Sequence, residues 1–194
     1  MDMPTDNTKP LHVTVRPKVG VDAGSFASRA ARLFHDDSRI AAEPSGGELA
    51  LSCTWYFDLE YAHARLCEAL PGEYLWSEPR IEYRSDRVNI NGTWCHVVLE
   101  PILRVEVHTR PEHVGTVIGD LSSRRGWVKS QQEKAGMITI GAEVPLSELS
   151  DYIPKLTEST EGKASATATF LKYDVRPSYL DPPPDEPMAA ALRA

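Results

Sequence analysis

Two stretches of the chain show the same succession of strand-type and helix-type hydrophobic patterns. This repetition limits the possible fold more than any other feature. Apolar and polar residues alternate over residues 11–15, as in a half-buried strand, and an apolar stripe at helical spacing follows over 26–34. A second alternation covers 49–55, and a second helical stripe covers 59–70. A short closing strand at 81–83 completes the order β-α-β-β-α-β.

The second stretch repeats this order with clearer signals. Apolar and polar residues alternate over 103–107 and again over 138–144. Between them, residues 112–122 have an apolar stripe at helical spacing. A further helical stripe over 146–156 and a last strand over 164–170 follow. This pattern predicts the same order of strands and helices a second time.

The beginning of the helix over 112–122 has a recognisable local signature. Thr109 and Glu112 are spaced as in a capping box, in which the hydroxyl accepts from an amide of the first turn and the carboxylate reaches back. Pro111 suits the first turn, where its missing N–H costs nothing.

The repeated order is typical of the ferredoxin-like fold, in which four antiparallel strands have both helices on one face. A chain of 194 residues is long enough for two such small domains. We therefore expect an α+β protein built from two ferredoxin-like domains.

The composition indicates a globular chain in a reducing compartment. Hydrophobic residues make up 41%, and no apolar run approaches the roughly 20 residues that cross a membrane. The first ten residues are polar and include Asp2 and Asp6, unlike a signal peptide. The 3 cysteines, Cys53, Cys67 and Cys95, form no CxxC motif. We expect a cytoplasmic protein without a membrane partner.

Charge points to one local candidate for a phosphate-bearing partner. The formal net charge of -7 argues against a general nucleic-acid coat. Between residues 124 and 134, however, the four basic residues Arg124, Arg125, Lys129 and Lys134 are accompanied only by the acidic Glu133.

Four motifs in the second stretch match one known family in order and spacing. They are Leu-Glu-Pro-Ile at 99–102, Val-Ile-Gly-Asp-Leu-Ser-Ser-Arg-Arg-Gly at 117–126, Val-Pro-Leu-Ser-Glu-Leu at 144–149 and Leu-Thr-Glu-Ser-Thr-Glu-Gly-Lys-Ala at 156–164. With these motifs, the second stretch resembles the fifth domain of bacterial elongation factor G over essentially its full length.

The first stretch is similar to the third domain of the same factor. Residues 12–18 match its opening strand, 33–44 its passage from helix to strand, and 78–84 its closing strand. One departure is large: the family has a Gly-rich turn with Glu-Leu-His-Leu-Glu before the second helix. Residues 54–60 read Thr-Trp-Tyr-Phe-Asp-Leu-Glu instead, so only the Leu-Glu end is kept.

The resemblance implies a division of the chain. We expect a disordered N-terminus (1–10), a third-domain-like unit (11–86), a linker replacing the fourth domain (87–97), a fifth-domain-like unit (98–176) and a Pro-rich disordered tail (177–194). A linker of about a dozen residues is too short for any domain.

The resemblance includes no GTPase domain, and the chain offers no phosphate loop of its own. The nearest candidate is Glu-Gly-Lys-Ala at residues 161–164. When the phosphate-loop motif is aligned on it, Thr157 stands where the first glycine belongs, and Ala164 stands where the magnesium-binding Ser or Thr belongs. We therefore expect no GTP hydrolysis, no cofactor and no enzymatic activity.

The candidate binding residues are Arg124, Arg125, Trp127, Lys129 and Lys163. The resemblance implies that the domain containing them faces ribosomal RNA and protein at the base of the ribosomal stalk. Arginine offers forked donors to phosphates, and an exposed tryptophan can stack on a base. Alternatively, the two arginines serve the end of a helix, with Gly126 as its left-handed cap.

No metal or catalytic site is predicted. His63 and Cys67 lie four residues apart on a predicted helix, a spacing that two metal ligands can use, but no second pair of ligands is near them in sequence. The histidines are scattered outside any nucleophile motif.

We predict a non-enzymatic, translation-factor-like protein that binds the ribosome or modulates elongation factor G. Three alternatives stay open. One is a module that binds a protein partner or associates with itself, without ribosome contact. Another is a small-molecule binder or enzyme that uses a cleft between the two domains. The third is a remnant with no function of its own.

Overall fold

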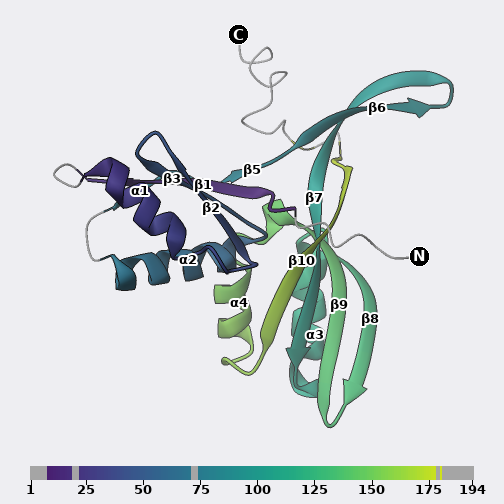
Figure 1. Cartoon of the computed structure of the whole chain (residues 1–194). Coiled ribbons are helices and arrows are strands. Elements are labelled where there is room, and N and C mark those ends of the chain that lie inside the picture. Colours follow the sequence, from purple (N-terminus) through teal and green to yellow (C-terminus); the bar gives the residue numbers. More distant parts are fainter. Residues whose placement is uncertain (1–7, 19–21, 71–73, 178–179, 181–194) are drawn as a thin grey trace.

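Both predicted β-α-β-β-α-β units are present in the computed structural model (Figure 1), which confirms the α+β, ferredoxin-like fold class. The structure describes residues 8–18, 22–70, 74–177 and 180. Most residues of the two ends that we expected to be disordered lie outside these ranges. No helix in the described part of the chain combines the length and apolar character that crossing a membrane requires.

The N-terminal domain is built on the first sheet. Its elements are β1 (Leu11–Pro17), α1 (Ala23–Arg32), β2 (Ile40–Ser45), β3 (Glu48–Cys53), α2 (Tyr56–Ala69), β4 (Tyr74–Trp76) and β5 (Arg80–Ile81). The strands are antiparallel in the order β2-β3-β1-β4, and β5 also pairs with β1. This is the strand order of a ferredoxin-like sheet.

The closing strand of this domain differs from the prediction. We expected it at residues 81–83, whereas it consists of β4 and β5, which pair with opposite ends of β1. Between them, the Ser77 amide donates to the Thr14 carbonyl, and the Ser77 hydroxyl accepts from the Thr14 amide. Pro79 lies in this interruption, and a proline has no N–H to donate to a ladder.

The core of the N-terminal domain follows the predicted alternation. Leu11, Val13 and Val15 of β1 are buried, as are Phe26 and Ala30 of α1. Burying one large side chain of this kind contributes about 1.5–3 kcal/mol. Ala62 and Leu66 of α2 belong to the same buried cluster as these residues, so both helices pack on the buried face of the sheet.

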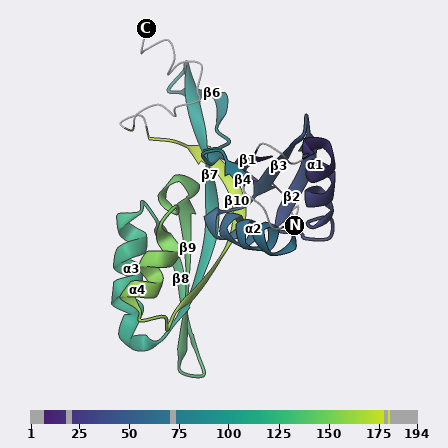
Figure 2. The same ribbon diagram turned by 90° about the vertical axis from the view of Figure 1, so that its left-hand side faces the viewer.

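The C-terminal domain is built on the second sheet. Its elements are β6 (Arg84–Ile90), β7 (Thr93–Thr109), η1 (Pro111–His113), α3 (Val114–Ser123), β8 (Trp127–Lys134), β9 (Met137–Pro145), η2 (Leu146–Glu148), α4 (Tyr152–Ser159) and β10 (Ser165–Val175). The order β10-β7-β9-β8 is again ferredoxin-like, and β6 pairs with β7. Figure 2 shows α3 and α4 together on one side of this sheet.

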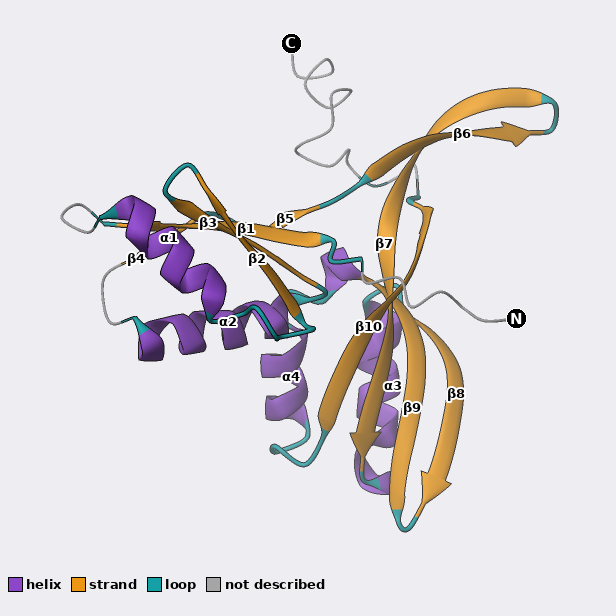
Figure 3. Cartoon of the chain, viewed as in Figure 1, coloured by secondary structure: helices purple, strands orange, loops and turns teal. Residues whose placement is uncertain are grey.

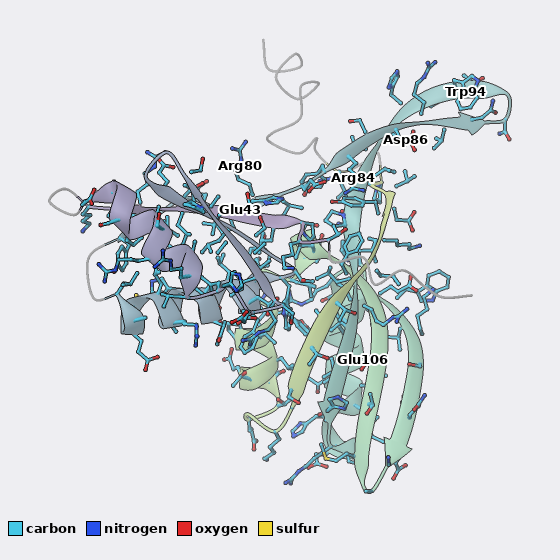
Figure 4. The ribbon with its side chains drawn as sticks, viewed as in Figure 1. Glu43, Arg80, Arg84, Asp86, Trp94 and Glu106 are labelled. Carbon is cyan, nitrogen blue, oxygen red and sulfur yellow. The ribbon has the colours of Figure 1, made fainter. Side chains whose placement is uncertain are left out.

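The opposite face of the second sheet is open. Leu103, Val105 and Val107 of β7 are buried under the helices, whereas Arg104 and Glu106 between them are exposed. Glu106 is labelled on this open face in Figure 4. The alternation of β7 therefore separates a core face from a face that a partner can reach.

The predicted capping box at Thr109 is absent. Thr109 is the buried last residue of β7, and its hydroxyl has no hydrogen-bond partner among the described residues. The helical region begins with the 3-10 turn η1, whose N-cap is Arg110 and whose first turn includes Pro111. The strand keeps Thr109 in its ladder opposite Ile138, so its hydroxyl faces the core instead of the helix.

The segment expected to be a linker, residues 87–97, lies in a β-hairpin. Strand β6 pairs with the first part of β7, and the two-residue turn between them is Asn91-Gly92, with φ of 51° and 87°. Asn-Gly with both φ values positive is the favoured turn for a two-residue hairpin. Figure 3 shows this hairpin extending away from both domains. We name residues 84–98 the hairpin arm.

The joint between the domains is short and is crossed by side-chain contacts. Only Glu82 and Tyr83 separate the last strand of the first sheet from the hairpin arm. The Glu82 amide donates to the Pro10 carbonyl at 2.7 Å, and its carboxylate lies 3.1 Å from Arg84 Nε. The Arg84 guanidinium in turn lies 3.9 Å from the centre of the Tyr173 ring on β10.

Candidate functional site

Arg124, the first predicted binding residue, is buried at the C-terminal end of α3. Its side chain is 7% exposed; Nε lies 2.9 Å from Asp120 and Nη1 lies 2.7 Å from Asp151. Nη1 also donates to the Glu148 carbonyl, and the guanidinium lies 5.2 Å from the Tyr152 ring. These contacts tie α3 to the beginning of α4.

Arg125 holds a buried carboxylate. Its Nη1 and Nη2 donate to the two Glu100 oxygens at 2.7 and 2.9 Å, and Nε donates to Glu148 at 2.8 Å. Glu100 is 2% exposed, so its charge requires a cation within hydrogen-bond distance. The hydrogen bond with Glu100 is the main cause that raises the Arg125 pKa above its ordinary value. We name Arg124, Arg125 and their carboxylate partners the arginine clamp.

The left-handed residue at the end of α3 is Arg125 and not Gly126, which was the expected cap. Arg125 has the left-handed backbone, with φ of 57°, and Gly126 follows it. The Gly126 amide donates to the Leu121 carbonyl at 2.9 Å, and a Cβ on Gly126 would lie 2.4 Å from the same oxygen. The glycine is thus needed for close approach, while the bonds with Glu100 stabilise the left-handed conformation of Arg125.

The arginine clamp favours the alternative interpretation, in which Arg124 and Arg125 serve the end of the helix, over phosphate binding. Both guanidinium groups are already engaged with carboxylates, so neither is free to bind a phosphate. The apparent local excess of positive charge arose because the balancing carboxylates are mostly distant in sequence. Glu100 lies on β7, Glu148 on η2 and Asp151 beside α4.

Trp127 and Lys129 are the predicted residues that remain accessible together. They lie on β8, the edge strand of the second sheet, and Trp127 is 69% exposed. Lys129 Nζ lies 3.3 Å from the centre of the Trp127 ring and 3.6 Å from Glu143 on β9. The pairing of β8 with β9 shifts between Val128 and Ser130, so Lys129 lies at a bulge. We name these two residues the Trp127–Lys129 pair.

Lys163 lies away from this pair. It follows the turn after α4, where Gly162 has φ of 72°, and its ammonium group is ion-paired with Glu161. The sheet register places the beginning of β10, Ser165, opposite His108 near the far end of β7. The predicted set of five residues therefore divides into the arginine clamp, the accessible Trp127–Lys129 pair and a separate Lys163.

Two accessible regions were missed by sequence reasoning. Arg104 on β7 lies opposite Glu143, on the same open face as the Trp127–Lys129 pair, and the strand alternation could have identified it. The hairpin arm carries Arg87 and Trp94, and Trp94 is 61% exposed. Asn91-Gly92 between two alternating segments was the signal that could have revealed the arm.

The three cysteines differ in burial: Cys53 is buried, Cys67 is exposed and Cys95 is intermediate. Burial raises the pKa of Cys53 to about 12, so its thiol stays protonated and unreactive at neutral pH. Cys67 lies 3.9 Å from His63 on α2, as their spacing predicted. Across residues 8–18, 22–70, 74–177 and 180, no group of three or more His, Cys, Asp and Glu side chains could hold a metal ion.

An open hollow of about 700 Å³ lies on the N-terminal domain. Its lining includes Arg32 at the end of α1 and Phe34, Ile40 and Pro44 beyond it. All of its lining residues lie between Lys9 and Pro44, within one domain. The hollow therefore gives no support to a small-molecule site between the two domains.

Residues 97–181 match the family model described as "Elongation factor G C-terminus". Residues 97–181 thus form a domain like the C-terminal domain of elongation factor G. All five predicted binding residues lie within the matched range, whereas most of the hairpin arm precedes it. The matched family is the C-terminal part of a translation factor, which suggests a role related to translation factors.

A solved structure shares the fold over most of the chain. The crystal structure of ttk003000868 from Thermus thermophilus is similar over 87% of this chain, with a TM-score of 0.59 and 20% sequence identity. The similarity covers 41% of the length of that protein. At this identity, the match shows a shared fold.

Proposed function

We propose that the chain is a non-enzymatic, translation-factor-like protein of the cytoplasm that binds the ribosome. The proposed contact is the Trp127–Lys129 pair on the edge strand of its elongation factor G-like C-terminal domain. The observation that supports it is the 69% exposure of a tryptophan on which a lysine ammonium is stacked. Large exposed aromatic side chains beside a cation are typical of surfaces that bind RNA or protein.

The surroundings of the Trp127–Lys129 pair favour a partner of mixed character. Glu143 lies beside Lys129 and opposite Arg104, so positive and negative side chains alternate across the open sheet face. Ribosomal RNA would contact the cations and the indole ring, and the stalk-base protein would contact Glu143. A second form of the proposal has the same surface bind elongation factor G and modulate it.

Cosedimentation with purified ribosomes tests the proposal. The double variant Trp127→Ala, Lys129→Glu should weaken binding at least tenfold, because stacking of one base contributes about 1–3 kcal/mol and 1.4 kcal/mol is tenfold. The fold should be unaffected, since both side chains are exposed.

Arg29→Glu provides a matched control for the change of charge. Arg29 is exposed on α1 of the N-terminal domain, so its reversal should leave ribosome binding unchanged. The proposal is wrong if the wild-type chain stays in the supernatant at low salt, or if the double variant binds as well as the wild type. A second assay asks whether the wild-type chain captures purified elongation factor G in the absence of ribosomes. If it does and the double variant loses this capture, the form of the proposal in which the chain modulates elongation factor G is supported.

Nucleotide binding distinguishes this function from an enzymatic one. The turn at 161–164 has its lysine paired with Glu161 and lacks the hydroxyl residue that holds magnesium. Titration calorimetry with GTP and magnesium should show no saturable heat. Micromolar binding would favour an enzyme.

A further inference from the structure

The hairpin arm presents one face whose side chains come from two strands. Arg87 lies opposite His96, and Asn89 lies opposite Trp94. Directly opposite residues share a face, and so do residues two apart along a strand. These four side chains therefore form one patch, which we name the arm patch. Figure 4 shows Trp94 on the outer part of the hairpin, away from both domains.

All four members of the arm patch are exposed. Trp94 is 61% exposed, and no other ring or cation of the described residues stacks on its indole. The Trp127 ring, by contrast, is covered on one side by Lys129. Trp94 therefore offers a free aromatic surface that a planar group can occupy.

The arm patch is cationic on an otherwise acidic chain. It contains Arg87, whereas the preceding residue, Asp86, lies on the opposite face of the hairpin. Within the described part of the chain, no ion pair engages the Arg87 guanidinium, although its backbone amide donates to Asp86. The formal net charge of -7 repels a polyanion from the rest of the chain, so Arg87 has to supply the local attraction.

The strand edges of the arm are less suited to a protein partner. The β6 edge carries the alternating charges Arg84, Asp86 and Arg87, which oppose pairing with another strand. The apolar side chains Val88 and Cys95 lie on the other face and are half-buried. The exposed chemistry of the arm is thus a planar ring with a guanidinium, an imidazole and an amide beside it.

We infer that the arm patch binds single-stranded RNA. One unstacked base packs on Trp94, and Arg87 binds an adjacent phosphate. Asn89 Oδ1 accepts from the Gly92 amide, so the Asn89 side-chain amide nitrogen and the His96 ring remain to hydrogen-bond with the edge of the base. Bases within a duplex are stacked on their neighbours, so only a single strand, loop or bulge can supply such a base.

This inference goes beyond the proposed function. The arm patch lies outside residues 97–181 and on a different part of the molecule from the Trp127–Lys129 pair. It is tested with free oligonucleotides, so its result does not depend on whether the chain binds ribosomes.

The experiment measures fluorescence anisotropy of a labelled, unstructured 12-nucleotide RNA with the full chain at low salt. Trp94→Ala should weaken binding about tenfold, and Arg87→Gln should weaken it several-fold. When the logarithm of the association constant is plotted against the logarithm of the salt concentration, the slope should be about −0.7 to −1.4. This is the slope expected for one or two phosphate contacts. A duplex of the same sequence should bind more weakly.

Two variants with comparable changes elsewhere serve as controls. Phe57→Ala removes an aromatic side chain that is 43% exposed on α2, and Arg29→Gln removes an exposed cation on α1. Both should retain wild-type affinity. Circular dichroism and urea unfolding of Trp94→Ala should match the wild type, because an exposed side chain adds little to stability.

Several results would overturn the inference. These are no binding by the wild-type chain, unchanged binding by Trp94→Ala, equal binding of the duplex, or loss of binding in Trp127→Ala alone. Light scattering provides a further check. A wild-type dimer that Trp94→Ala converts to a monomer would assign the patch to self-association instead of RNA.

Discussion

The pair Arg124–Arg125 and the pair Trp127–Lys129 are separated by a single glycine, yet their surroundings are opposite. The two arginine side chains are 7% and 21% exposed and are held by carboxylates on α3, on β7, on η2 and just before α4. Trp127 is 69% exposed, and Lys129 stacks on it from the same strand. A run of basic residues in a sequence therefore need not be one site.

The glycine between the two pairs accounts for the difference. Arg125 ends α3 in a left-handed conformation, and at Gly126 the chain turns against the Leu121 carbonyl and enters β8. Residues before the turn point toward η2 and α4, and residues after it belong to an edge strand. The arginines consequently stabilise the domain, whereas the Trp127–Lys129 pair is available to a partner.

The largest expected effect comes from removing one member of the arginine clamp. Arg125→Ala leaves Glu100 buried without its cation, and breaking a buried ion pair in this way costs about 3–5 kcal/mol of unfolding free energy. Arg125→Lys should recover only part of this loss, because an ammonium cannot make both parallel hydrogen bonds. Urea unfolding at pH 7 measures both variants.

The matched control for this prediction is Lys129→Ala. An exposed lysine beside one carboxylate should change the unfolding free energy by less than about 0.5 kcal/mol. If the arginine and lysine variants lose equal stability, the distinction between the two pairs is wrong.

A second prediction extends the comparison to a buried carboxylate without such a clamp. Burial raises the pKa of Asp58 on α2 to about 6 from an ordinary value of 3.8, although the charge of Arg39 partly opposes the increase. At pH values between these two pKa values, the Asp58 carboxyl group holds its proton more tightly in the folded chain than in the unfolded chain. The contribution of Asp58 to stability is therefore present at about pH 4 and lost as the pH rises through 6.

Asp58→Asn isolates this contribution, because the amide does not titrate. The unfolding free energy of the variant should rise relative to wild type by about 2–3 kcal/mol between pH 4 and pH 7, since one pKa unit is 1.36 kcal/mol. Urea titrations of both proteins at several pH values give the difference. A difference that is independent of pH would contradict the raised pKa.

The smallest expected effects concern two glycines of the same helix region. Gly126→Ala places a Cβ 2.4 Å from the Leu121 carbonyl and should destabilise the chain by about 1–3 kcal/mol. Gly119→Ala, where no atom lies within 4 Å of the added carbon, should stabilise α3 by about 0.5–1 kcal/mol. Thermal unfolding should shift the midpoints in opposite directions, and a shift in the same direction would contradict the role of Gly126.

The sequence by itself determined the order of strands and helices in both domains. The alternation over residues 103–107 predicts which side chains face the core, because a strand places successive residues on opposite faces. The motifs at 117–126 and 156–164 predicted the family of the C-terminal domain, which the match over 97–181 confirms. The hairpin arm could also have been predicted from Asn91-Gly92, a local signal that we did not use.

Only the tertiary structure decided which charges are free. The partners of Arg124 and Arg125 include Glu100 and Asp151, which lie about 25 residues away in the chain and come close only when α3, α4 and β7 pack together. The missing cap at Thr109 has the same origin, since the strand ladder, rather than local spacing, fixed the direction of its hydroxyl. Periodicity is a property of neighbouring residues, whereas the pairing of charges depends on distances between distant ones.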